Sequence, residues 1–384
     1  MKKYLPAVPV AAAIVVLIIV WAFLLQSSVA PSDPVISTTP PQVYVGVDLA
    51  YGNMQGVENQ INQMSSYINL VIIGSTGITY NTQQLNSVCQ FIYNKGLYFI
   101  LYTEAPPSHQ WLQSALNKWG NHFLGLYAYD EPGGKQLDID IKGGMAVTSA
   151  ANETDAANKY IETVSHHLEG IRSTFGNSNT SLFTSDYGLY WFDYQAGYDT
   201  VFAEFVDSYS RQLNVALVRG AAEAQNKSWG VMITYTNQSD LESGPDLLSN
   251  MTYAYNSGAK YIVVFDSNAQ WTQNILQTQQ LKAMQQFWQY MQNNSQPSNP
   301  VSARTAYVLP ADLGYGFRGP NDRIWGLWLA DNFTLQICQN LSDALQQYGG
   351  KLDIVYSDAA QPNFTNVYDA AIFWNGTTIV NNSF

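Results

Sequence analysis

Short runs of apolar and β-branched residues alternate, from Val43 to about Gln280, with longer segments whose apolar residues recur at helical spacing. Continuous apolar runs are typical of strands buried on both faces, and their alternation with helices indicates parallel strands joined by right-handed crossovers. Eight such strand and helix pairs in about 250 residues predict a (β/α)8 TIM barrel. The expected strands are VYVGVD, LVIIGST, YFILYT, FLGLYAYD, SLFTSD, TVFAEF, GVMITYT and YIVVFD.

Most of these runs end on or near a carboxylate. Because the carboxyl ends of all strands in a parallel barrel open onto one mouth, the acids predict a shared site there. A doubly wound open sheet is the main alternative, but the count of eight and the missing glycine fingerprint after the first strand disfavour it. The strand-end acids are Asp48, Glu104, Asp130, Glu131, Asp186, Glu204 and Asp266.

The amino terminus has a different pattern. Lys2 and Lys3 precede an uncharged stretch from Ala7 to Leu25, close to the roughly 20 residues that span a bilayer. This length favours an uncleaved signal anchor over residues 1–26, with cleavage after Ala30 as the alternative. Residues 27–42, rich in Pro, Ser and Thr, predict an extended spacer.

The two lysines place the rest of the chain outside the cell, since positive residues stay on the cytoplasmic side. We therefore expect a single-pass cell-membrane protein with an extracellular body, or a secreted one if it is cleaved. Glycosylation sequons support this location and predict a glycoprotein. They begin at Asn152, Asn179, Asn226, Asn237, Asn250, Asn293, Asn332, Asn340, Asn363, Asn375 and Asn381.

The predicted barrel covers residues 43–293 and is followed by a linker with two prolines at 294–304. Residues 305–384 show a strand, a helix and two further strands, which predicts a small α/β domain packed on the barrel. Between the first strand and the helix of this region lies a glycine-rich loop with Arg318 and Arg323, which either reach over the mouth or pair with surface acids. The net charge of -12, without a basic run, argues against a nucleic-acid partner.

The sharpest local motif is Asp130-Glu131-Pro132 at the end of the fourth strand. Proline has no N–H to donate to the sheet ladder, so Pro132 ends the strand and exposes the acids. The motif resembles the Asp-Glu-Pro or Asn-Glu-Pro that many TIM-barrel glycoside hydrolases carry at this strand. That resemblance implies that Glu131 is the general acid and that Asp130 orients it or binds sugar hydroxyls.

The chain departs from the most populous clan of these enzymes, whose second carboxylate ends strand seven. Here strand seven ends in Tyr235 and Thr236. Other barrel glycosidases pair acids on strands four and six, which makes Glu204 the first candidate for the partner. Asp266 and then Asp186 follow.

Aromatic residues at the strand ends are candidates for sugar binding, because they bury large faces and keep a polar tip. Together with three of the acids they form the predicted substrate-binding set: Asp48, Glu104, Asp186, Tyr187, Trp191, Tyr235 and Trp271. Two alternatives stay open. Asp48, Asp186 and Asp266 also fit caps of the turns that follow them, and the aromatic cluster also fits packing.

Other chemistries have less support. The four histidines lack the i, i+4 spacing of a zinc site, and no Gly-X-Ser-X-Gly nucleophile motif occurs. We expect no cofactor, although several acids at one mouth leave a calcium or magnesium ion open. The sequence thus predicts an extracellular, membrane-anchored glycoside hydrolase acting on polysaccharide or glycoconjugate substrates. The alternative is a non-catalytic glycan-binding or structural surface protein with a degenerate barrel.

Overall fold

The computed structural model describes residues 40–102, 108–138, 144–174, 180–206, 209–236, 240–268, 274–296, 304–319, 321–357 and 368–380. The predicted signal anchor and nearly all of the spacer lie outside these residues. Within the described part of the chain, no helix has both the length and the apolar character needed to cross a bilayer. The described residues, from Pro40 onward, form one compact unit.

Eight parallel strands close into a barrel, in the order β1-β10-β7-β6-β5-β4-β3-β2. The predicted TIM barrel is therefore confirmed, and the closed order excludes an open doubly wound sheet. The strands are β1 (Tyr44–Leu49), β2 (Leu70–Ile73), β3 (Tyr98–Tyr102), β4 (Phe123–Tyr127), β5 (Ser181–Asp186), β6 (Thr200–Phe205), β7 (Ser228–Ile233) and β10 (Tyr261–Phe265).

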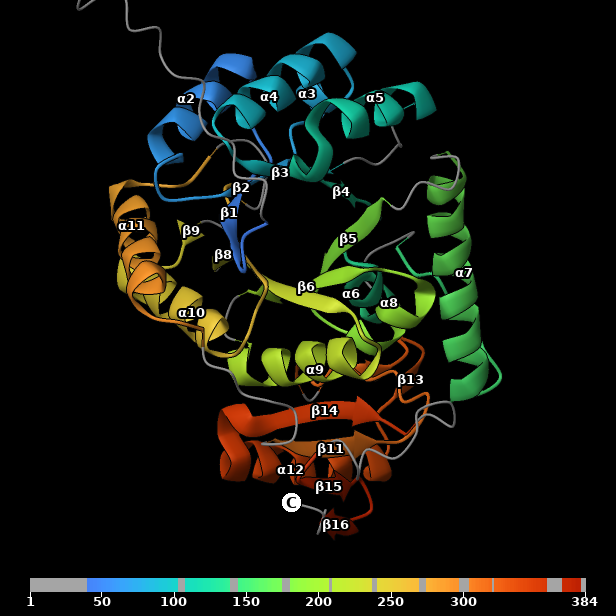
Figure 1. The fold of residues 1–384 in the computed structure, drawn as a ribbon. Coiled ribbons are helices and arrows are strands. Elements are labelled where there is room, and N and C mark those ends of the chain that lie inside the picture. Colours follow the sequence, from blue (N-terminus) through green and yellow to red (C-terminus); the bar gives the residue numbers. More distant parts are fainter. Residues whose placement is uncertain are drawn as a thin grey trace, which may run out of the picture. The chain divides into compact units, whose positions relative to one another are not determined.

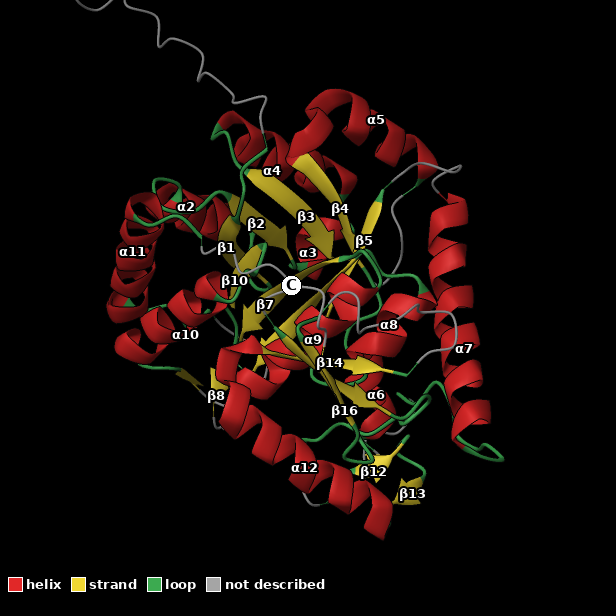
Figure 2. Ribbon diagram, turned by 60° about the horizontal axis from the view of Figure 1, so that its bottom comes forward, coloured by secondary structure: helices red, strands yellow, loops and turns green. Residues whose placement is uncertain are grey.

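Helices surround the barrel, as Figures 1 and 2 show. Several begin at a polar side chain that accepts a backbone N–H, such as Asn81 before α4 and Ser243 before α10. Their apolar stripes pack on the outer face of the strands. The helices are α2 (Met54–Met64), α3 (Thr76–Thr79), α4 (Thr82–Asn94), α5 (His109–Trp119), α6 (Pro132–Leu137), α7 (Glu153–Thr174), α8 (Tyr190–Ala196), α9 (Arg211–Ala224), α10 (Gly244–Asn256) and α11 (Thr278–Asn293).

The barrel interior holds a second, separate apolar cluster. Because side chains alternate across a strand, every second residue of each strand points inward. The inward residues of the cluster are apolar, and six of the eleven buried members are aromatic, so they form a packed core inside the barrel. The buried members are Tyr44, Leu70, Ile72, Tyr98, Ile100, Tyr127, Phe183, Phe202, Met232, Tyr261 and Val263.

A second sheet follows the barrel in the order β14-β11-β15-β16. This part of the chain has the succession of strand, helix, strand and strand expected from the sequence, and β16 adds an antiparallel edge strand to the sheet. Its division from the barrel as a separate domain stays a prediction. The elements are β11 (Thr305–Leu309), α12 (Asn332–Tyr348), β14 (Leu352–Tyr356), β15 (Ala370–Phe373) and β16 (Thr378–Val380), with short strand pairs β8 (Tyr235–Thr236) with β9 (Asp240–Leu241) and β12 (Arg323–Ile324) with β13 (Trp328–Leu329).

Helix α9 lies between the barrel and β14 (Figures 1 and 2). A cluster of buried charges joins the two: Nε of Arg219 donates to Asp353 at 2.6 Å, and Nη1 of Arg304 lies 2.8 Å from the other oxygen of Asp353. Arg304 also pairs with Glu223 of α9. The second sheet is thus fixed to the barrel by α9 through charge pairs as well as apolar packing.

Gly220 allows the close approach of α9 to β14, because a Cβ at this position would lie 2.2 Å from the carbonyl oxygen of Ile354. We expect Gly220→Ala to lower the free energy of unfolding by about 1–3 kcal/mol, since overpacking outweighs the gain in helix propensity. Chemical denaturation measures the change.

Gly170→Ala is the matched control, because Gly170 lies in α7 with nothing within 4 Å of its added Cβ. This substitution is expected to stabilise the protein by about 0.5–1 kcal/mol. Equal effects of the two substitutions would contradict the close contact between α9 and β14.

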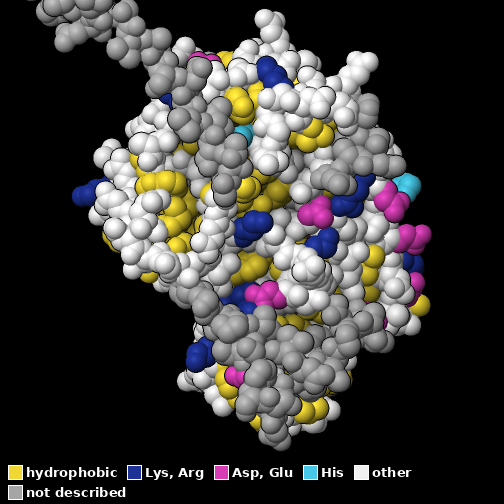
Figure 3. All heavy atoms as spheres, viewed as in Figure 1, with side chains coloured by type: hydrophobic (Ala, Val, Ile, Leu, Met, Phe, Trp, Pro, Cys, Tyr) yellow, Lys and Arg dark blue, Asp and Glu magenta, His cyan; other side chains and the backbone are white. Residues whose placement is uncertain are grey.

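Charged side chains are sparse on the face drawn in Figure 3, and acidic ones gather toward the edge where α7 runs. The small number of charged side chains follows from a composition with only 12% charged residues. A continuous basic surface, which phosphate backbones require, is not formed by the described residues on this face.

Candidate active site

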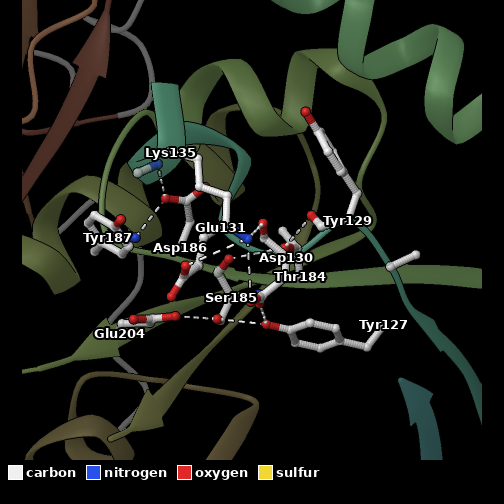
Figure 4. Close-up of polar contacts among 12 residues, drawn as sticks. Tyr127, Tyr129, Asp130, Glu131, Lys135, Thr184, Ser185, Asp186, Tyr187 and Glu204 are labelled. Carbon is white, nitrogen blue, oxygen red and sulfur yellow. Dashed lines mark hydrogen bonds and ion pairs between the residues drawn. The ribbon is translucent and has the colours of Figure 1, made fainter. Parts of the chain in front are cut away.

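A row of hydrogen-bonded side chains lies at the carboxyl end of the barrel, with the Asp130–Glu131 turn beside it (Figure 4). Ser185 and Glu204 each follow by two residues an interior aromatic, Phe183 on β5 and Phe202 on β6. Strand alternation therefore directs both side chains into the barrel, one layer above the apolar core. Tyr127 of β4 is in register with Phe183, one layer below, and its hydroxyl reaches Ser185.

The row contains three oxygen-to-oxygen contacts. Tyr127 contacts Asp130 at one end, Oη of Tyr127 lies 2.7 Å from Oγ of Ser185, and Ser185 contacts Glu204 at the other end. Two hydroxyl groups supply only two hydrogens for these three contacts. The third hydrogen bond therefore requires a proton on Asp130 or Glu204, and the row holds one carboxyl proton.

The carboxyl groups of Glu131 and Glu204 are close enough to influence one another electrostatically. Burial, followed by the nearby charge of Asp130, raises the pKa of Glu131 to about 7. Burial, followed by the charge of Glu131, raises the pKa of Glu204 well above its usual range. The side chain of Glu131 is 27% exposed, whereas Glu204 as a residue is only 6% exposed. Glu131 is thus the more accessible member of an acid pair that retains protons near neutral pH.

Lys135 is the cation beside this pair. Its Nζ lies 3.7 Å from a carboxylate oxygen of Asp130 and 3.8 Å from one of Glu131, and it donates to the backbone oxygen of Asp130 at 2.7 Å. Burial raises the pKa of both acids, and the charge of Lys135 offsets part of that rise. Lys135 therefore holds the turn in place and favours the ionised forms of Asp130 and Glu131.

The turn that carries Glu131 has an unusual backbone. Tyr129 and Glu131 have φ angles of 56° and 50°, in the left-handed region that non-glycine residues rarely adopt. Asp186 holds the turn, because its carboxylate accepts the N–H groups of Gly133 at 2.6 Å and Gly134 at 2.7 Å. Such strain costs about 1–3 kcal/mol and persists where surrounding contacts enforce it, typically at active sites.

Two further polar atoms of the mouth are buried without a hydrogen-bond partner among the described residues. They are Oδ1 of Asp48 and Oη of Tyr190. Burial and then the charges of Asp130 and Asp266 raise the pKa of Asp48 well above its usual range. Burial, followed by nearby carboxylates that include Glu204, also raises the pKa of Tyr190. Both side chains therefore belong to the surroundings of the acid pair.

Asp186 and Asp266 have the geometry of caps. The carboxylate of Asp186 also accepts the N–H groups of Tyr187 and Gly188. Asp266 accepts the N–H groups of Ile275 and Leu276, both at 2.8 Å, and the side chain of Gln60 at 2.6 Å. The occupied oxygens agree with the capping alternative, so the roles of Asp266 in catalysis and Asp186 in substrate binding stay predictions without geometric support.

The predicted aromatic residues separate into two groups. Burial and then the charge of Glu131 raise the pKa of Tyr187, whose hydroxyl donates to Asp138 at 2.7 Å. Trp191 is buried and packs on Tyr356 of the second sheet, with ring centroids 5.3 Å apart, as the packing alternative implies. Tyr235 lies in β8, and its side chain is outside the description; Glu104 and Trp271 fall outside the described residues altogether.

Arg318 pairs with acids, which was one of the two alternatives for the glycine-rich loop. Its guanidinium lies 2.8 Å from Asp138 and 2.7 Å from Asp322, over the ring of Tyr187 at 5.3 Å. The loop between β11 and α12 thus supports the edge of the site through Tyr187 and Asp138.

No group of three or more His, Cys, Asp or Glu side chains is placed to share a metal ion within the described part of the chain. The sequence interpretation missed Tyr127, Ser185, Lys135 and Tyr190. Counting inward positions along each strand would have found Tyr127 and Ser185, since both share a face with the interior aromatics.

The raised pKa of Glu131 predicts a pH dependence of stability. An unfolded glutamate titrates near about 4.3, so the folded protein binds more protons between that pH and about 7. Stability is therefore highest below the unfolded pKa and falls as the pH rises toward 7. We expect the free energy of unfolding to be about 1–2 kcal/mol lower at pH 8 than at pH 5.

Urea denaturation at the two pH values measures this difference, and Glu131→Gln is expected to reduce it. Glu169→Gln is the control, because Glu169 is exposed on α7, away from the mouth. A wild-type protein that is more stable at pH 8, or a difference unchanged by Glu131→Gln, would contradict the raised pKa.

Neither a protein-family model nor a curated protein sequence matches the chain. Solved structures do match its fold. The β-galactosidase of the psychrophilic Marinomonas ef1 has a TM-score of 0.55 at 12% identity, over 86% of this chain and 72% of the other. The cold-adapted enzyme of Rahnella sp. R3 has a TM-score of 0.56 at 10% identity, over 88% and 68%.

A third β-galactosidase, from the Antarctic haloarchaeon Halorubrum lacusprofundi, has a TM-score of 0.53 at 12% identity, over 87% of this chain and 69% of its own. At these identities the likeness concerns the fold. The chain therefore shares its barrel fold with these three β-galactosidases.

Proposed function

We propose that the protein hydrolyses glycosidic bonds, with Glu131 as the general acid and Glu204 as the second carboxylate. The observation that carries this proposal is the electrostatically interacting pair of Glu131 and Glu204 at the barrel mouth, with the pKa of Glu131 raised to about 7. Glycoside hydrolysis requires one protonated and one ionised carboxyl group, and a closely spaced pair separates the two protonation states.

In this mechanism Glu131 donates its proton to the departing glycosidic oxygen. Glu204, ionised while the carboxyl proton of the row lies on Asp130, stabilises the positive charge that develops on the sugar. A water molecule then adds to the anomeric carbon and releases the proton that restores the acid. Glycosidases separate the two carboxyl groups by about 5–5.5 Å or about 6.5–9.5 Å. A bound sugar must place its glycosidic oxygen within reach of Glu131 and its anomeric carbon beside Glu204. Glu131 is the member that the sugar can reach from solvent, because Glu204 is 6% exposed and held by Ser185.

The row from Asp130 to Glu204 allows the protonation state of Glu204 to change. Its two hydroxyl groups link the carboxyl groups through short contacts, so one shared proton can shift along the row without leaving the protein. Asp130 then serves as a positioning residue at the far end of the row, and Tyr127 and Ser185 connect it to Glu204.

A wild-type screen tests the activity. The purified full chain is incubated with neutral, acidic and aminated polysaccharides, and the release of reducing ends is measured at about pH 6, below the raised pKa of the acid. Release from at least one glycan, absent in heat-denatured protein, is the expected result. Failure to cleave any of them would remove the basis of the enzyme proposal.

The second candidate is a non-catalytic glycan-binding protein. The specific observation in its favour is that β7 ends at Ile233 and continues into Thr234, without the acid that the most populous clan carries there. Tight binding of a glycan by the full chain without release of reducing ends would favour this candidate.

The location belongs to the proposal as well. The uncharged stretch from Ala7 to Leu25 and the set of sequons support a membrane anchor with the barrel outside the cell. Carbonate extraction of membranes and enzymatic deglycosylation test the two parts. A protein released by carbonate and unchanged in mass by deglycosylation would contradict both.

A further inference from the structure

We propose that the mouth of the barrel binds a glycan bearing a protonated amine, and that Asp48 is the residue that recognises this group. The inference rests on the proposed function, because it names the substrate class of the same site. Amino sugars with a free amine are the ligand class meant here, as opposed to neutral or N-acetylated sugars.

Asp48 lies on the inward face of β1. Tyr44 of β1 belongs to the interior cluster, and strand alternation directs Asp48, four residues later, to the same side. Gly74 follows β2 at an inward position, and a Cβ on it would lie 2.7 Å from Oδ1 of Asp48. The missing side chain at position 74 thus leaves room for the carboxyl group inside the mouth.

The carboxyl group of Asp48 is buried, and its protonated form is favoured. Asp48 is 5% exposed, and its Oδ1 is buried without a hydrogen-bond partner among the described residues. Burial raises its pKa, and the charges of Asp130 and Asp266 raise it further. A buried acid surrounded by acids is unfavourable unless a cation compensates it, so the group is suited to a positively charged ligand.

The charges around the mouth also favour a cationic ligand at Asp48. Lys135 lies within ion-pair distance of two of the acids at the mouth, Asp130 and Glu131. The other two are Asp48 and Glu204. Within the described ranges, the ion pairs include neither Asp48 nor Glu204. Asp48 therefore has no cationic partner within the described part of the protein, and its ionised form would be stabilised by a cationic ligand.

An ammonium group fits this environment better than a sugar hydroxyl or a metal ion. A hydroxyl can donate to Asp48 but leaves its charge uncompensated, whereas an ammonium supplies three donors and a positive charge. A divalent ion requires several ligands at once, and the described side chains offer no such group of three. The amine would lie beside Asp48, where the charge of Asp130 also acts.

The test compares sugars that differ in this one group. Binding of glucosamine and galactosamine to the full chain is measured by calorimetry at about pH 6, each against its N-acetylated counterpart. We expect at least one amine to bind about tenfold or more tightly than its counterpart. Binding should also release protons, because the cation favours the ionised form of Asp48, and two buffers with different ionisation heats measure this release.

Asp48→Asn is expected to abolish both the preference and the proton release. The variant keeps the shape of the side chain, and thermal unfolding confirms that it is folded. The control is Glu169→Gln, which removes one negative charge from an exposed site on α7 and is expected to bind like the wild type. Equal binding of amine and N-acetyl sugars by the wild type, or a preference retained in Asp48→Asn, would overturn the inference.

The outcomes separate this inference from the proposed function. Hydrolysis of a neutral glycan without any preference for amines would retain the function and overturn the inference. Asp48-dependent binding of amines, with no hydrolysis of any glycan, would retain the inference and support the non-catalytic candidate.

Discussion

Replacing Glu131 by Gln is expected to lower kcat/KM for hydrolysis of the natural glycan by about 10²- to 10⁴-fold, the usual contribution of a general acid. Gln keeps the size of the side chain but has no proton to donate to the leaving oxygen. The fold is expected to persist, because the variant removes an acid whose burial and neighbours oppose ionisation. Initial rates of reducing-end release measure the effect.

The leaving group distinguishes the two acids of the pair. Aryl glycosides with an acidic phenol need little protonation, so Glu131→Gln is expected to retain more activity on them than on glycans. Glu204→Gln is expected to lose activity on both, since charge stabilisation is required for either substrate. Full activity of Glu131→Gln on a confirmed glycan would contradict its role, and Glu169→Gln serves as the unaffected control.

Asp353→Asn is expected to destabilise the protein by about 3–5 kcal/mol, the typical cost of leaving a buried charge unpaired. Asp353 is fully buried between Arg219 of α9 and Arg304 before β11. Asn can accept a hydrogen bond but cannot compensate two guanidinium charges. Chemical denaturation followed by a spectroscopic probe in the second sheet measures the loss.

The matched control is Asp343→Asn, because Asp343 is exposed on α12 and accepts from the side chain of Gln339 at 3.0 Å. An exposed site of this kind is expected to change stability by less than about 0.5 kcal/mol. Equal small effects of the two substitutions would show that the charge cluster does not hold the second sheet to the barrel.

The barrel was predictable because its signal is local and repeated. Runs such as YIVVFD and SLFTSD are buried over nearly their whole length, and the helices between them carry one apolar stripe each. The same runs placed Glu204 correctly on strand six, whereas strand four ends at Tyr127 and Glu131 lies directly before the helix α6 that follows it. Their pairing in the structure follows from the geometry of a closed barrel, in which all strand ends face one mouth.

The remainder of the site depends on contacts that no local pattern contains. Asp186 and Asp266 end strands just as Asp48 does, yet they lie one position off the inward face and accept backbone N–H groups instead. Trp191 belongs to an aromatic cluster near the mouth, but it packs on Tyr356, which is far away in sequence. Only the tertiary structure separates acids that face the interior from acids that cap turns and helices.

The pH dependence of glycan hydrolysis by the wild-type chain tests the central claim most directly. Because Glu131 must be protonated to act as the acid, kcat/KM is predicted to fall as the pH rises through about 7, the pKa of Glu131. The same fall should be absent from the residual activity of Glu131→Gln. A rate that stays constant or increases through about pH 7 in the wild type would contradict the assignment of Glu131 as the general acid.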